Sequence, residues 1–260
     1  MKRRLLPILM TLVLVCALPI WAAFVTSGDV TNPLVSTAWA TLPDLQAKID
    51  AAADNATITL DSNTEIAATL QITKNLTLDL NGCVLRMRGT GSVLKVSGRA
   101  TLTITDSSAA KSGTITGGNA EDGGGVYVDN NATLEMTGGC ITDCHASYGG
   151  GGIFSYGNLY MSGTAKIEKC TGSDDAIWNR ENSDIYADGG TVDGTVNNQG
   201  TIRLSEGAAA ETVFNGTVYN RSAGTIKAGR YNETVENNGT ISGGTFCGGV
   251  TIRKGSWVWE

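Results

Sequence analysis

The sequence predicts an all-β solenoid, a stack of short coils, on three observations. One short pattern returns at intervals of about 17 to 27 residues between residues 123 and 241, a spacing typical of solenoid repeats. The last proline is Pro43, so no later residue lacks the N–H that a strand ladder needs. Charged residues make up 17% and aromatic residues 6%, while Gly, Thr, Asn and Val are frequent, which disfavours both disorder and a helical fold.

Residues 1 to 25 combine positive charge with a long apolar run. Lys2-Arg3-Arg4 precede apolar residues from Leu5 to about Val25, a pattern typical of a signal peptide, and the run is also long enough for a signal anchor. Both alternatives predict a secreted or cell-surface protein. Loss of the three positive charges would lower the formal net charge from −6 to −9.

The negative net charge restricts the kinds of partner that we expect. The chain contains no basic stripe, so we expect no nucleic-acid partner, and membrane contact only through an uncleaved N-terminal segment. We expect a monomer.

Residues 26 to 40 are small and polar and predict a linker. Residues 41 to 55 then predict a short capping helix, because Leu45, Ile49 and Ala52 follow helical spacing and Pro43 stands near the first turn. A helix at this point can cover the open end of the first coil, which otherwise exposes strand edges and core.

Residues 56 to 260 form the predicted repeat domain. Apolar residues alternate with Thr, Lys or Asp in short segments, as in residues 76 to 80, which end in the turn dipeptide Asn81-Gly82. Aligned repeats give each coil three strands, of the types seen at residues 126–128, 134–136 and 141, and three bends.

The later repeats place an asparagine at one equivalent position. Stacked asparagines can hydrogen-bond from coil to coil and satisfy backbone groups at a bend, so we interpret the set as a structural ladder and not as a ligand site. Its members are Asn179, Asn198, Asn220 and Asn237.

Glycines before an apolar residue, as at 124–126 and 151–153, and the run Ala176-Ile177-Trp178-Asn179 make the repeats resemble right-handed parallel β-helix proteins of the pectin lyase-like superfamily. Within it, the repeats are similar to bacterial surface and secreted proteins, including polymorphic autotransporter repeats. The resemblance covers about residues 39 to 255 and implies a right-handed parallel β-helix. Such proteins include lyases, hydrolases, adhesins and passive stalks, so the fold does not imply one activity.

An aromatic row provides the main candidate ligand site. Tyr127, Phe154 and Trp178 fall in the outward slot of three successive coils, and Tyr219 returns to that slot. Exposed rings can stack on sugar rings, although stacked aromatics can also simply stabilise neighbouring coils. A second, shorter column with the same two interpretations contains Tyr160 and Tyr186.

A charged cluster provides the weaker, catalytic alternative. Paired carboxylates can serve a glycosidase, but these residues fall on bends, where charge is also expected as a solvated surface. The candidates are Asp143, His145, Lys169, Asp174, Asp175 and Arg180.

Cys144 and Cys170 occupy matching places in successive repeats. One coil apart, they predict either a disulfide or a stack of buried thiols. The sequence has no C-x-x-C pair and the exported part has an odd number of cysteines, so we expect no metal and no other cofactor.

Three hypotheses for function follow. The first is a non-enzymatic, exported interaction module that binds polysaccharide or cell-surface glycan, like an adhesin. The second is a polysaccharide lyase or glycoside hydrolase with a site on the bends around residues 143 to 180. The third is a structural spacer without a ligand.

Overall fold

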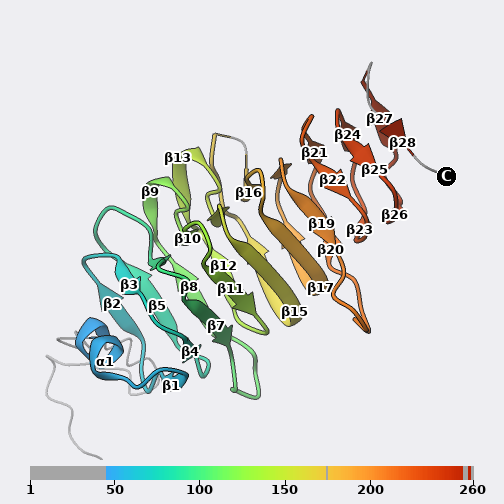
Figure 1. Cartoon of the computed structure of the whole chain (residues 1–260). Helices are drawn as coiled ribbons and strands as arrows, with labels where there is room; N and C mark the ends of the chain where they lie inside the picture. The colour runs from blue at the N-terminus through green and yellow to red at the C-terminus, as the bar shows by residue number, and fades with distance from the viewer. Residues whose placement is uncertain (1–44, 174, 254–256, 259–260) are drawn as a thin grey trace, which may run out of the picture. The chain divides into compact units, whose positions relative to one another are not determined.

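The computed structural model describes residues 45–173, 175–253 and 257–258, with no side chains for the last two. These residues belong to the unit that spans Ala38–Glu260. The described chain forms a parallel β-helix, in which successive coils stack side by side (Figure 1) and every named strand pairs in parallel with its counterparts one coil away. The predicted leader and linker, residues 1 to 40, lie outside the described residues.

Each coil contributes strands to three faces of the solenoid. The first face contains β1 (Ala56–Thr59), β4 (Leu76–Asp79), β7 (Thr101–Thr105), β11 (Thr133–Met136), the first parts of β15 (Asn158–Glu168) and β17 (Asp184–Asp193), β19 (Thr201–Arg203), β22 (Thr225–Ile226), β25 (Thr240–Ile241) and β28 (Trp257–Val258).

The second face follows the first around each coil. It contains β2 (Thr64–Ile66), β5 (Val84–Met87), β8 (Thr114–Thr116), β12 (Cys140–Thr142), the last parts of β15 and β17, β20 (Val213–Phe214), β23 (Arg230–Tyr231) and β26 (Thr245–Phe246). Because β15 and β17 run through both faces, the two form a single 17-stranded sheet in the described chain.

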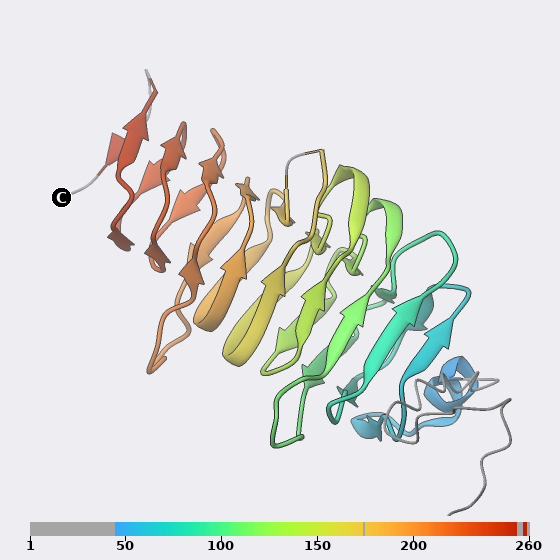
Figure 2. The same ribbon diagram turned by 180° about the vertical axis from the view of Figure 1, so that it is seen from behind.

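The third face is a separate nine-stranded sheet of three-residue strands, and Figure 2 shows the coils from behind. Its members are β3 (Leu70–Ile72), β6 (Leu94–Val96), β10 (Val126–Val128), β14 (Ile153–Ser155), β16 (Ile177–Asn179), β18 (Val196–Asn198), β21 (Val218–Asn220), β24 (Val235–Asn237) and β27 (Val250–Ile252). Two further strands, β9 (Asn119–Asp122) and β13 (His145–Gly149), pair with each other before the third face begins.

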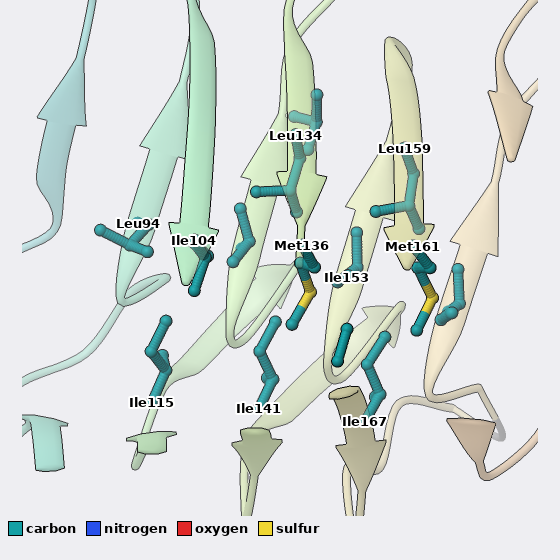
Figure 3. Packing of buried hydrophobic residues seen from close by; sticks show 14 of the residues in the cluster. Leu94, Ile104, Ile115, Leu134, Met136, Ile141, Ile153, Leu159, Met161 and Ile167 are labelled. Atoms are coloured by element: carbon teal, nitrogen blue, oxygen red, sulfur yellow. The ribbon is translucent and has the colours of Figure 1, made fainter. Parts of the chain in front are cut away.

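The core lies between the three faces and is built of equivalent residues from neighbouring coils. Leu134 and Leu159 of the first face meet Ile141 and Ile167 of the second, and all four side chains are fully buried (Figure 3). Each such side chain contributes about 1.5 to 3 kcal/mol by leaving water. The alternation of apolar and polar residues therefore sets the inward side of the strands on the three faces, as predicted.

A short helix, α1 (Leu45–Ala51), lies at the N-terminal end of the stack, within the predicted segment 41 to 55. Leu45 and Ile49 are buried in the common core. The side chain of Gln46 pairs with the backbone of Gln71 in β3: its Oε1 accepts from the Gln71 N–H (2.8 Å) and its Nε2 donates to the Gln71 carbonyl (3.1 Å). The helix thus satisfies backbone groups at the outer edge of the first third-face strand.

Two buried carboxylates hold the bends of the N-terminal coils. Asp79 accepts from the backbone N–H groups of Asn81 (3.0 Å) and Ser107 (2.9 Å). Asp106 accepts from three backbone N–H groups, the closest being that of Gly113 at 2.6 Å. Burial alone would raise both pKa values, but these hydrogen bonds to the ionised forms outweigh it, and the pKa of each carboxyl is lowered.

The four asparagines form a continuous ladder inside the third face. Asn179 Nδ2 donates to Asn198 Oδ1 (2.8 Å), Asn198 to Asn220 (2.8 Å) and Asn220 to Asn237 (2.7 Å), and all four side chains are fully buried. Each Nδ2 also approaches a backbone carbonyl at the following bend, such as that of Gly224 for Asn220 (3.2 Å). In the earlier coils the same slot holds Ile72, Val96 and Val128, and Ser155 stands between the two sets.

Candidate functional site

The outer surface of the third face carries the predicted aromatic row. The strand register aligns, in order, Gln71, Lys95, Tyr127, Phe154, Trp178, Asn197, Tyr219 and Glu236. Tyr127, Trp178 and Tyr219 are half-buried. The structure therefore brings the four predicted aromatic residues into one column, which Asn197 interrupts.

One member of the row does not reach solvent. Phe154 is only 1% exposed, so the expectation that it offers its ring to a ligand is wrong. Tyr156, in the next bend, packs edge-on against it with ring centroids 5.2 Å apart, Tyr127 stacks on it at 5.6 Å, and the Arg180 guanidinium lies 5.9 Å from its ring. Alternation along a strand tells which side a residue faces, but not that a neighbouring bend covers that side.

The most exposed rings of the site are two tyrosines that the sequence analysis did not select. Tyr148, at 52% exposure, stacks on Trp178 with ring centroids 5.0 Å apart, and Tyr156 is 36% exposed. Trp178 packs against Gly149, where an added Cβ would lie only 1.8 Å from a carbon of its ring. Because Gly149 has no side chain, β13 approaches the third face closely. We call β13 (His145–Gly149) the wall beside the aromatic row. In the sequence, the only signal for this arrangement is Tyr148 followed by Gly149.

Cationic side chains lie among these rings. Arg180 is 5.4 Å from the Tyr156 ring and 5.3 Å from that of Trp178. At either end of the row, Lys95 Nζ lies 5.0 Å from the Tyr127 ring and Arg221 lies 5.0 Å from that of Tyr219. The positive groups thus share the outer surface with the aromatic faces.

Two of the hollows that adjoin the row combine an aromatic face with a carboxylate. The Lys95 hollow, of about 570 Å³, lies beside Tyr127 and is lined largely by polar side chains: Thr69, Gln71, Thr90, Ser92, Lys95, Asn119, Glu121 and Asp122. The Trp178 hollow, of about 240 Å³, is lined by Tyr148, Ser173, Asp175, Trp178, Asn197, Tyr219 and Arg221. The Trp178 hollow combines three aromatic side chains with polar groups and the Lys95 hollow combines one, Tyr127, with polar groups, as ligand sites commonly do.

Each hollow contains one carboxylate that is at least partly buried. Burial, with a smaller contribution from Glu121, raises the pKa of Asp122, and its Oδ1 atom is buried without a hydrogen-bond partner. Asp175 is 5% exposed and accepts from Asn197 Nδ2 at 3.3 Å. Arg221 Nε in turn donates to Asn197 Oδ1 at 2.8 Å. These two hydrogen bonds hold the Asn197 side chain between Asp175 and Arg221 in the lining of the Trp178 hollow.

The structure divides the predicted catalytic cluster. Asp143 lies at the corner before β13, His145 begins β13, and Lys169 lies at the matching corner one coil later. All three are exposed and line neither hollow. His145 Nδ1 lies 3.1 Å from the Thr171 hydroxyl. Arg180 and Asp175 belong instead to the aromatic surface, and Asp174 lies outside the described residues. The five described candidates therefore do not lie together in one site.

The second aromatic column lies on the first face, away from both hollows. Tyr160 and Tyr186 stack with ring centroids 4.0 Å apart and planes 2° from parallel, so each buries one ring face against the other. Burial and the neighbouring Tyr186 hydroxyl raise the pKa of Tyr160 to about 12. Arg203 lies over Tyr186 at 4.6 Å and pairs with Asp184 at 2.5 Å. This column therefore leaves little ring surface for a sugar.

Cys144 and Cys170 are buried free thiols in the structure, which is the second of the two predicted arrangements. The interaction between the two neighbouring thiols lowers the pKa of Cys144 and raises that of Cys170. The described residues contain no group of three or more side chains that could hold a metal ion. None of the described helices is long and apolar enough to cross a membrane.

Comparisons with known proteins do not assign this chain to a family. No family model, curated protein or solved structure matches the chain.

Proposed function

We propose that this protein is an exported, non-enzymatic interaction module that binds glycan, in the manner of an adhesin, on the outer surface of its third face. The observation that carries the proposal is the pair of hollows along the aromatic row, one beside Tyr127 and the other lined by Tyr148, Trp178 and Tyr219. Sugar rings stack on such aromatic faces, while hydroxyl and amide side chains of the hollows pair with sugar hydroxyls.

The length of the surface favours an extended ligand. Five coil steps separate the Lys95 strand from the Tyr219 strand, which at about 4.8 Å per step is about 24 Å. A polymer lying along the solenoid would contact both hollows at once, whereas a single sugar would occupy only one. We therefore infer a polysaccharide or an oligosaccharide of several units.

Secretion or display at the cell surface forms part of the proposal. It rests on the positive charge and apolar run of residues 1 to 25. Membership of the pectin lyase-like superfamily is likewise inferred, from the repeat pattern together with the parallel β-helix. Proteins of this architecture include both binding proteins and enzymes, so the function has to be inferred from the residues of the site.

The proposal is tested by titrating the purified chain with neutral and acidic soluble polysaccharides and with oligosaccharides of increasing length. We expect affinity to rise with length, and Tyr148→Ala to weaken binding by about tenfold through loss of stacking. Tyr160→Ala, on the first face, is the matched control and should bind normally. Equal affinity of the two variants would contradict this location.

Catalysis is measured in the same incubations through release of reducing or unsaturated sugar. Turnover that disappears in Asp175→Ala would replace the binding proposal with a lyase or hydrolase. Failure to bind any member of a broad glycan panel would leave the spacer hypothesis.

A further inference from the structure

Cys144 and Cys170 lie side by side at the same corner of two successive coils. The residues before them pair in register, Thr142 with Glu168, and the residues after them pair as well, His145 with Thr171. Asp143 and Lys169, which precede the cysteines, share the same left-handed backbone, with φ of 51°. Equal geometry on both sides sets the two α-carbons about 4.8 Å apart, within the range that a disulfide spans.

Both side chains are buried at this corner. The Cys144 thiol donates to the backbone carbonyl of Thr142 (3.4 Å), and the Cys170 thiol donates to that of Ile141 (3.6 Å), the residue that pairs in register one coil before Ile167. Cys140 differs, because its register partners are Thr114 and Lys166. Among the described cysteines, this pair therefore has the geometry for a bond within the chain.

We propose that Cys144 and Cys170 are a redox pair that closes to a disulfide by exchange with a small-molecule disulfide such as oxidised glutathione. One cysteine thiolate attacks a glutathione sulfur and releases one glutathione thiolate. The second cysteine thiolate then attacks the mixed disulfide, the protein S–S bond forms and the second glutathione leaves. The two protons lost by the cysteines go to the two released glutathiones, so the protein is oxidised by two electrons and glutathione is reduced by two.

The bond would fasten the base of the wall beside the aromatic row. Cys144 directly precedes β13, which carries Tyr148, and Cys170 directly precedes Thr171. Thr171 accepts from the Ala146 N–H at 2.8 Å, and the Ser173 hydroxyl donates to the Tyr148 carbonyl. Closure would hold these two segments together covalently, which goes beyond the proposed glycan binding and does not depend on it.

The test exposes the reduced chain to oxidised glutathione, both folded and during refolding, because the folded thiols are buried. The products are alkylated in denaturant without reductant and mapped by mass spectrometry. We expect one cross-linked peptide pair that contains Cys144 and Cys170, lighter by two hydrogen atoms than the reduced peptides. The Tm should rise by about 6 to 12 °C on oxidation.

The variants separate this pair from other thiol chemistry. Cys140→Ser should retain both the cross-link and the rise in Tm, whereas Cys144→Ser should lose both. Full alkylation of Cys144 and Cys170 in both arms of the wild-type experiment would overturn the proposal. So would cross-linking of either residue mainly to Cys83, Cys140 or Cys247.

Discussion

The same slot of the third face is filled in two different ways along the solenoid. In the N-terminal coils it holds Val96 and Val128, which are packed in the apolar core, and in the C-terminal coils it holds the asparagine ladder. The coils differ in length as well: 32 residues separate Val96 from Val128, but only 17 separate Asn220 from Asn237. At the ladder each amide lies beside a carbonyl of the following bend, and a buried carbonyl needs a donor, which an amide supplies and a valine does not.

The two halves therefore solve one structural problem with different chemistry. The long N-terminal coils hold their bends with the carboxylates of Asp79 and Asp106, which lie at another corner and accept from backbone N–H groups. The short C-terminal coils use neutral side-chain amides that donate to carbonyls. The first solution depends on pH, and the second does not.

The largest effect is expected from breaking the ladder at its centre. Asn220→Leu removes the acceptor of Asn198 Nδ2 and the donors to Asn237 and to the carbonyl of Gly224, all of which stay buried. We expect the free energy of unfolding to fall by about 3 to 5 kcal/mol. Urea denaturation followed by circular dichroism measures the loss. An unchanged midpoint would show that the ladder does not stabilise the later coils.

The reverse substitution in the N-terminal half sharpens the comparison. Val128→Asn places an amide between Val96 and Ser155, where no ladder exists to receive it. We expect a loss of about 2 to 4 kcal/mol, from lost apolar burial and an unsatisfied polar group. The same denaturation assay applies, with Val128→Thr as a smaller polar control. A neutral outcome would mean that the slot accepts either chemistry in any coil.

The smallest effect that we expect is a change of stability with pH at the N-terminal bends. Because the pKa values of Asp79 and Asp106 are lowered in the folded protein, the stability they contribute is fully present above their ordinary value of 3.8. It is lost as the pH falls through the folded-state pKa. Asp106→Asn should cost about 2 kcal/mol at pH 7, and its difference from wild type should narrow below pH 3.8. Urea titrations at pH 7, 5 and 3 measure this, and a difference independent of pH would contradict the assigned charge.

The alternation and repetition of residues predict which side chains fill the core, but not how the outer surface is arranged. Alternation has a period of two, so it specifies which residues enter the core, and repeated positions specify which of them meet, as for Asn198 and Asn220. The burial of Phe154 depends instead on Tyr156 folding back from a bend, and the wall depends on β9 pairing with β13 across an intervening coil segment. Neither of these strands alternates clearly, because both stand outside the repeat. Pattern therefore located the aromatic row but not the residues that expose or cover it.

The variation in coil length has a consequence for how such a surface changes over generations. A residue inserted within a three-residue strand would turn the following side chains to the opposite side and disrupt the core. A residue inserted in a bend only enlarges the outer surface, since the next strand still pairs in register, as the coils of 32 and 17 residues do here. New walls and hollows can thus arise on one side of the molecule while its interior stays the same.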